Sequence, residues 1–135
     1  MSKKLVVVAI SRDEARVWKS SLDPHTEPDA IRAPMENVHH HVRIGQFHRG
    51  HDTDHMSSKY FEEIALAIHD ADEILLIGHG KGKASYTLHL TQYLERKHPD
   101  VAQKVVDALA VDLENLSEGE ILDLAREWQD QHALM

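Results

Sequence analysis

Histidines are concentrated in one short segment of the chain. Residues 39–55 read HHHVRIGQFHRGHDTDH and hold six of the twelve histidines. His51 and His55 are four residues apart, so a helix that started early would place both on one face, as in helical zinc pairs. His48 could add a third nitrogen ligand. The spacing predicts a site for a divalent metal such as zinc, but histidine-rich tracts also bind metals incidentally, and a solvated or RNA-contacting loop is the third interpretation.

The same segment is locally basic although the whole chain is acidic. Between residues 30 and 50 there are three arginines, Arg32, Arg43 and Arg49, and a single acid. The formal charge of −8 excludes a general nucleic-acid coat protein, because affinity for phosphate needs a high density of lysine and arginine. Phe47 is a candidate for stacking on a base. Protonation of all twelve histidines would change the charge from −8 to +4, so this surface should respond to pH.

A glycine-rich turn is the second place where chemistry is conceivable. Residues 78–83 read GHGKGK, directly after an apolar run and before a predicted helix. Amides at the start of that helix could hold a phosphate, with Lys81 and Lys83 beside it. The glycine spacing matches neither the P-loop nor the dinucleotide fingerprint. The alternative is a tight strand-to-helix turn with an exposed lysine.

Several function classes are excluded or disfavoured. The chain has no cysteine, which rules out disulfides, thiolate catalysis and cysteine-bound zinc. Its longest apolar run is six residues, too short to cross a membrane, so we expect a cytoplasmic protein without a membrane partner. Asp13, Asp107 and Asp112 are too sparse for two-metal nuclease chemistry. Ser11 and Ser85 lack the context of a nucleophile elbow, and no small-molecule substrate is evident.

The pattern of apolar residues predicts the elements that would position these groups. We expect one domain over residues 1–135, of the α/β class, with a β-hairpin and a third strand followed by helix–strand–helix–strand–helix. A long histidine-rich loop is expected at about residues 36–56, and parallel strands in the second half. The expected strands are 4–10, 15–20, 30–33, 73–77 and 105–111, and the expected helices are 56–69, capped by Ser57-Ser58, then 84–98 and one that begins at Ser117.

This order of elements carries a set of short motifs. The first is Ile74–Gly78 followed by Gly80 and Lys83, and the second is His98-Pro99-Asp100 followed by Val105-Val106 and Asp112. The ordered set resembles the middle domain of the class-one peptide-chain release factors of eukaryotes and archaea. It is closer still to small bacterial relatives often labelled translational machinery proteins. The resembling stretches are Leu5–Ser20, Tyr60–Lys83 and His98–Trp128. The resemblance implies a ribonuclease-H-like fold with a mixed sheet.

The release factors carry Gly-Gly-Gln in the loop between the early strands and the first helix, and its glutamine reaches the peptidyl-transferase centre. Here Gly45-Gln46 follows Ile44, so the first glycine and its backbone freedom are missing. We therefore expect no peptidyl-tRNA hydrolysis. The resemblance implies instead a translation-associated protein that binds the ribosome or structured RNA. The expected contact residues are Arg43, Gly45, Gln46 and Arg49 in the loop, and Lys81 and Lys83 in the glycine turn.

Two alternatives come from other classes. The first is a metal-binding protein or metal-dependent enzyme that uses His48, His51 and His55. It predicts stoichiometric metal in untagged protein. The second is an adaptor that acts through the acidic C-terminal helix, although such charge is usually a solvated helix face.

Overall fold

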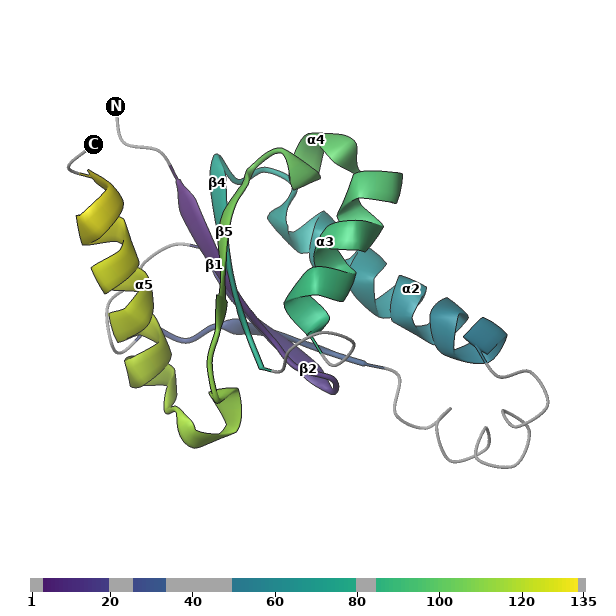
Figure 1. The fold of residues 1–135 in the computed structure, drawn as a ribbon, viewed down its shortest axis with the longest axis horizontal. Helices are drawn as coiled ribbons and strands as arrows, with labels where there is room; N and C mark the ends of the chain where they lie inside the picture. Colours follow the sequence, from purple (N-terminus) through teal and green to yellow (C-terminus); the bar gives the residue numbers. More distant parts are fainter. Residues whose placement is uncertain (1–3, 20–25, 34–49, 80–84, 134–135) are drawn as a thin grey trace.

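The computed structural model describes residues 4–19, 26–33, 50–79 and 85–133, with only the backbone described for 50–57 and 133. Figure 1 shows the arrangement of the elements. The strands are β1 (Leu5–Ile10), β2 (Glu14–Trp18), β3 (Asp29–Arg32), β4 (Glu73–Gly78) and β5 (Val105–Ala110). The helices are α2 (Gly50–Ile68), α3 (Tyr86–Lys97), α4 (Pro99–Ala102), the 3₁₀ helix η2 (Leu113–Asn115) and α5 (Glu118–Ala133).

The five strands form one mixed sheet in the order β3-β2-β1-β4-β5. Strand β2 is antiparallel to both β1 and β3, with Val7 opposite Trp18, whereas β4 is parallel to β1 and β5. The crossover helices between β1 and β4 and between β4 and β5 make this parallel pairing possible. The predicted hairpin, third strand and parallel second half are therefore confirmed, and with them the mixed ribonuclease-H-like sheet.

Helices cover both faces of the sheet, giving three layers (Figure 1). On one face Val6, Val8 and Ile10 pack with the apolar side chains of α2 and α3. On the other face Val7 and Ala9 pack with α5 and η2. All six residues of β1 are buried, because this strand has a neighbour on each side and a helical layer above and below. The all-apolar sequence LVVVAI is the consequence of that central place.

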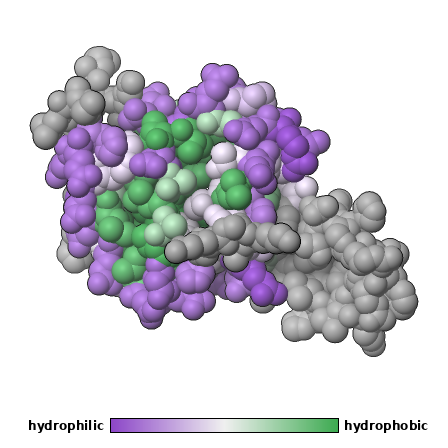
Figure 2. Space-filling model, in the orientation of Figure 1, coloured by the Kyte–Doolittle hydropathy of each residue, from purple (hydrophilic) through white to green (hydrophobic). Residues whose placement is uncertain are grey.

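Strand β5 forms one edge of the sheet and is only partly covered. Its residues alternate between partly buried and exposed, and Val106 is 39% exposed. Figure 2 shows apolar surface in this area, between α5 and the helices of the opposite layer. Within the described ranges, no helix is long and apolar enough to cross a membrane.

One predicted boundary is wrong. Helix α2 begins at Gly50, six residues before the predicted Met56, so the segment 50–56 is helical rather than part of the loop. Ser57-Ser58 accordingly lie inside the helix and do not cap it. The prediction relied on apolar periodicity, which this polar segment lacks. Its sequence still suits a helix start, since acidic residues in the first turns interact favourably with the helix dipole.

The other helix ends follow the sequence closely. Ser117 and Glu120 form the predicted capping box before α5: the Ser117 amide donates to Glu120 Oε1 at 2.8 Å, and the Glu120 amide donates to Ser117 Oγ at 3.1 Å. Ser85 caps α3, because its Oγ accepts from the Leu88 amide at 3.2 Å. Pro99 ends α3 and occupies the first turn of α4. These caps fix where α3 and α5 start relative to the sheet.

Candidate functional site

Four strands finish at the same end of the sheet, which is called the carboxyl edge because their carboxyl-terminal residues lie there. Strands β1, β4 and β5 are parallel, and β3 also runs in their direction because both β1 and β3 are antiparallel to β2. The carboxyl ends of all four therefore lie at the same edge. Two hydrogen bonds close this edge: the Ala33 amide donates to the Asp13 carbonyl and the Val111 amide to the Gly78 carbonyl, both at 2.9 Å. Ligands of open α/β sheets usually bind outside the carboxyl ends of the strands.

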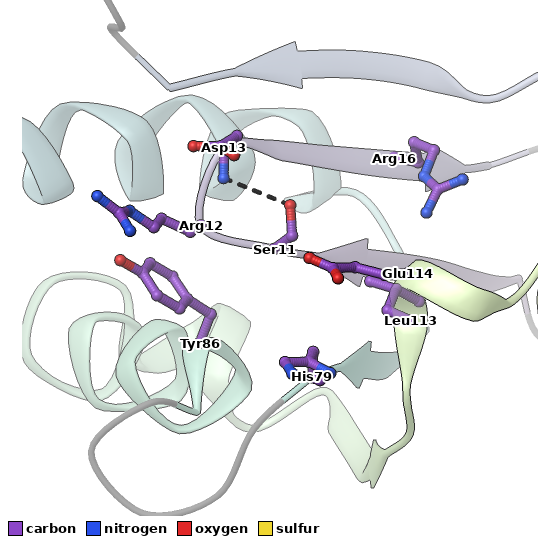
Figure 3. Close-up of a pocket in the computed structure, with 8 residues that line it drawn as sticks. All are labelled: Ser11, Arg12, Asp13, Arg16, His79, Tyr86, Leu113 and Glu114. Carbon is purple, nitrogen blue, oxygen red and sulfur yellow. Dashed lines mark hydrogen bonds between the residues drawn. The ribbon is translucent and has the colours of Figure 1, made fainter.

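A pocket of about 540 Å³ opens at this carboxyl edge (Figure 3). Its walls come from the β1–β2 turn, from β2, from the residue after β4, from the first residue of α3 and from η2. The lining residues are Ser11, Arg12, Asp13, Arg16, His79, Tyr86, Leu113 and Glu114. Its volume lies within the range of about 300–1,000 Å³ that is common for small-ligand sites.

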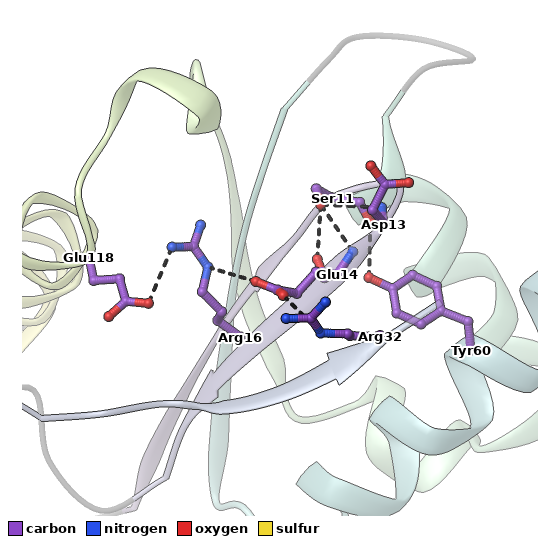
Figure 4. A network of polar contacts seen from close by, with 7 residues as sticks. All are labelled: Ser11, Asp13, Glu14, Arg16, Arg32, Tyr60 and Glu118. Carbon is purple, nitrogen blue, oxygen red and sulfur yellow. Dashed lines mark hydrogen bonds and ion pairs between the residues drawn. The ribbon is translucent and has the colours of Figure 1, made fainter. Parts of the chain in front are cut away.

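Hydrogen bonds of Ser11 hold the turn that forms one wall of the pocket. Its hydroxyl donates to the Glu14 carbonyl at 3.0 Å and accepts from the Glu14 amide at 3.2 Å. The Ser11 carbonyl accepts from the buried Tyr60 hydroxyl at 2.9 Å (Figure 4). Burial raises the pKa of Tyr60 well above its ordinary value, and the nearby Glu14 carboxylate raises it further. Through these hydrogen bonds both Tyr60 and Ser11 stabilise the turn.

Ion pairs fix Arg16 beside the pocket (Figure 4). Its guanidinium lies 3.6 Å from Glu118 at the start of α5 and 4.0 Å from Glu14. Arg32 also pairs with Glu14, at 3.7 Å. Arg16 is therefore shared between two carboxylates, whereas Arg12 makes no ion pair or hydrogen bond within the part of the chain that the structure describes. Arg12 is the cation that a ligand could use.

Gly78 lets β4 and α3 approach closely behind the pocket. A β-carbon at this position would lie 2.5 Å from Thr87 Cγ2 and 3.2 Å from the Ile10 carbonyl oxygen. The first distance is too short for a β-carbon and the second is a tight contact, so packing favours glycine here. This gives Gly78 a structural role and supports the tight-turn interpretation at the first glycine of the motif.

A second polar cluster lies where α2, α3 and α4 meet. Tyr93 donates its hydroxyl proton to Glu62 Oε1 at 2.6 Å, and His98 Nε2 lies 2.7 Å from the same oxygen. An ionised carboxylate only accepts, so His98 carries a proton on Nε2 in this arrangement. The hydrogen bonds from His98 and then Tyr93 lower the pKa of Glu62. Burial and the hydrogen bond to Glu62 raise the pKa of Tyr93 to about 12.

Most contact and metal residues predicted from the sequence lie outside the described residues. These are Arg43, Gly45, Gln46, His48, Arg49, Lys81 and Lys83. His51 and His55 lie in α2, four positions apart, because the helix begins early; only their backbone is described. No group of three histidine, aspartate or glutamate side chains is arranged for a metal ion among the side chains that are described.

Asp107 and Asp112, two of the aspartates considered for metal chemistry, have separate partners. Asp107 accepts from the Trp128 indole at 2.7 Å and from the Ala108 amide at 2.8 Å. Asp112 lies 3.6 Å from His79 Nδ1 across the carboxyl edge. This arrangement supplies no cluster for two-metal chemistry within the described ranges.

The pocket itself was missed at the sequence level. Arg12, Tyr86 and Glu114 come from three distant parts of the chain, and no spacing rule links them. The signal that could have located them is topological, since each follows or precedes a strand end at the carboxyl edge.

Comparison with known proteins matches this fold. No family model matches the chain, and no curated protein sequence is detectably similar to it. The crystal structure of Archaeoglobus fulgidus Pelota superposes with a TM-score of 0.54 at 13% identity, covering 97% of this chain and 37% of Pelota. An archaeal translation termination factor, aRF1, gives a TM-score of 0.44 at 14% identity, over 96% of this chain and 40% of that protein.

The chain has the fold of one part of Pelota. The resemblance inferred from the sequence is thus confirmed at the level of fold. The chain spans well under half of the length of either solved protein. The activities and partners of those whole proteins therefore do not transfer to it directly.

Proposed function

We propose that this protein acts in translation by binding the ribosome or structured RNA at the carboxyl edge of its sheet. The observation that carries the proposal is the Pelota-like fold over 97% of the chain. It agrees with the release-factor resemblance of the sequence motifs.

The topology supports a single contact surface. The histidine-rich segment leaves the described fold after Ala33, and the glycine turn leaves it after His79. Both residues lie at the carboxyl edge, beside the β1–β2 turn with Arg12. The proposed contact residues are Arg43, Gly45, Gln46 and Arg49 from the first segment, Lys81 and Lys83 from the second, and Arg12.

The net negative charge favours RNA binding through a local group of basic residues rather than through the whole surface. With a formal charge of −8, most of the surface repels phosphate. In this proposal attraction comes from the named contact arginines and lysines, through a small number of phosphate contacts. Each phosphate contact adds about −0.9 (duplex) or −0.7 (single strand) to the slope of log affinity against log salt concentration. We therefore expect salt-sensitive binding with a shallow slope.

Sucrose-gradient sedimentation of untagged protein in its own cell lysate tests this proposal. We expect the protein to co-migrate with ribosomal particles at low salt and to dissociate as salt rises. Charge reversal of Arg43 and Arg49 to glutamate should abolish co-migration. The matched control reverses Arg96 and Lys97, two exposed residues at the far end of α3, and should leave it intact.

The controls decide between specific and general attraction. Loss of co-migration in both double variants would indicate net charge alone and would contradict a defined surface. Wild-type protein that stays at the top of the gradient at low salt would refute a ribosomal role.

A divalent-metal site is the second candidate function, favoured by one observation. Helix α2 begins at Gly50, which supplies the helical backbone that a His51–His55 pair requires. The proposed ligands are His48, His51 and His55, with zinc as the expected ion. Untagged protein should then contain one equivalent of metal by elemental analysis, and His51→Ala should lose it. Metal-free protein after growth in zinc-supplemented medium would reject this function.

A further inference from the structure

The lining of the pocket at the carboxyl edge contains both positive and negative side chains in equal number. Its charged lining residues are Arg12 and Asp13 on the β1–β2 turn, and Arg16 and Glu114 on the other side, with His79 at the end of β4 (Figure 3). Arg16 is already paired with Glu118 and Glu14. A small anion would gain Arg12 but would approach two carboxylates, whose repulsion offsets the attraction. The lining suits a ligand that has hydrogen-bond donors as well as a negative charge.

Tyr86 provides a rigid aromatic wall. Its ring meets Phe61 edge-on at a centroid distance of 6.3 Å and His89 edge-on at 5.6 Å. These contacts hold the ring through its neighbours, and the residue remains partly exposed in the pocket. In Figure 3 the ring and Arg12 border one end of the pocket, and His79 and Glu114 border the other. An aromatic ring beside a guanidinium that has no partner among the described residues is a typical surface for stacking an unpaired base.

We propose that this pocket binds one unstacked nucleotide of RNA. The base stacks on the Tyr86 ring, the phosphate pairs with Arg12, and a carboxylate of Asp13 or Glu114 accepts hydrogen bonds from the edge of the base. Guanine suits this best, because it presents two adjacent N–H donors to one carboxylate. The inference rests on the proposed function and adds the ligand class and the residues that recognise it.

Amide NMR titration of the whole protein with guanosine 5′-monophosphate tests this inference, with inorganic phosphate as the comparison. We expect the nucleotide to shift the amides of the β1–β2 turn, His79 and η2. Tyr86→Leu should weaken binding about tenfold or more, the size of a lost base–aromatic stack. Tyr86→Phe should retain it, because the ring stays.

Arg12→Gln tests the phosphate contact without any risk to the core, since this side chain is exposed. It should weaken binding of guanosine 5′-monophosphate. The amide shifts caused by guanosine, which has no phosphate, should stay the same as in the wild type. Arg96→Gln removes an exposed arginine from the opposite end of α3, about 15 Å along the helix axis from Tyr86. This matched control should bind like the wild type.

Three results would overturn the inference. They are no shifts at millimolar nucleotide, equal affinity for inorganic phosphate, and equal binding by wild type and both the Tyr86→Leu and Arg12→Gln variants. The gradient experiment separates this failure from that of the proposed function. Protein that co-migrates with ribosomes but ignores the nucleotide refutes the pocket assignment only. Protein that binds the nucleotide but stays at the top of the gradient refutes the translation role only.

Discussion

Among the described residues, one polar cluster lies at the carboxyl edge of the sheet and another where α2, α3 and α4 meet. They differ in how many of their polar side chains have hydrogen-bond or ion-pair partners among the described residues. In the helix cluster, Glu62 Oε1 lies 2.6 Å from the Tyr93 hydroxyl and 2.7 Å from His98 Nε2. At the carboxyl edge, Arg12 has no partner among the described residues, and His79 and Asp112 stand 3.6 Å apart with more than half of each side chain exposed.

The difference shows which cluster serves stability and which is available for binding. Short hydrogen bonds from Tyr93 and His98 to Glu62 Oε1 link the three helices, so this oxygen serves the fold. At the carboxyl edge, the Arg12 guanidinium lies on a turn that is fixed by hydrogen bonds, and its N–H donors are available to a binding partner. The turn below Arg12 is fixed by Ser11 and Tyr60, so the carboxyl edge combines a rigid support with a guanidinium that has no partner among the described residues. Four predictions test this contrast.

The largest effect is expected at Gly78, on which the carboxyl edge is built. Gly78→Ala places a β-carbon 2.5 Å from Thr87 Cγ2, which forces β4 and α3 apart. Overpacking of this kind typically costs about 1–3 kcal/mol. Urea denaturation should show the loss of unfolding free energy.

A double variant separates the clash from any effect of alanine itself. Thr87→Ser removes the methyl group and keeps the hydroxyl that lies 2.9 Å from Ser85 Oγ. Gly78→Ala combined with Thr87→Ser should recover part of the lost stability. Stability equal to the wild type in Gly78→Ala alone would show that the packing argument is wrong.

The next effect is expected at Tyr60, which supports the turn of the pocket. Tyr60→Phe removes the hydroxyl that donates to the Ser11 carbonyl at 2.9 Å, in a residue that is 2% exposed. The lost hydrogen bond should cost about 0.5–1.5 kcal/mol, and more if the carbonyl stays dry. Thermal unfolding measures this cost. An unchanged melting temperature, together with an unchanged nucleotide titration, would mean that the turn does not depend on Tyr60.

The helix cluster should limit stability at both ends of the pH scale. The pKa of Glu62 is lowered in the folded state, so its contribution is present above its ordinary value of 4.5 and is lost as pH falls through the folded value. The pKa of Tyr93 is raised to about 12, so its contribution is present below 10 and is lost as pH rises from 10 toward 12. Because 41% of the Glu62 side chain is exposed, solvent screening keeps its effect at about 1 kcal/mol or less.

Variants of Glu62 and Tyr93 test which residue causes the loss of stability at acid pH and which at alkaline pH. Glu62→Gln should flatten the acid limb of the stability profile, and Tyr93→Phe should flatten the alkaline limb. Urea midpoints measured across pH give both limbs. Profiles parallel to the wild type in both variants would show that the cluster contributes nothing to the pH dependence.

The two clusters also mark how far sequence reasoning reaches. Apolar runs such as Leu5–Ile10 and the Ser117–Glu120 capping box predicted strands and helix ends because these depend on local sequence. The early start of α2 escaped prediction, since a polar helix without an apolar stripe has no periodicity to detect. The pocket escaped for a different reason: it joins Arg12, Tyr86 and Glu114 through the topology of the sheet alone. The predicted contact residues Arg43, Gln46 and Arg49 stay predictions, because they lie outside the described residues.

The smallest effect on stability is expected at Arg12, and that result completes the contrast. Arg12→Gln removes an exposed side chain with no ion pair among the described residues, so the free energy of unfolding should change by less than about 0.5 kcal/mol. The same variant should weaken nucleotide binding. A residue that affects binding without affecting stability belongs to a surface kept for a partner, whereas Tyr93 should show the opposite behaviour. If Arg12→Gln destabilised the fold as much as Tyr60→Phe, the carboxyl edge would be a second structural cluster, and the distinction between the two regions would fail.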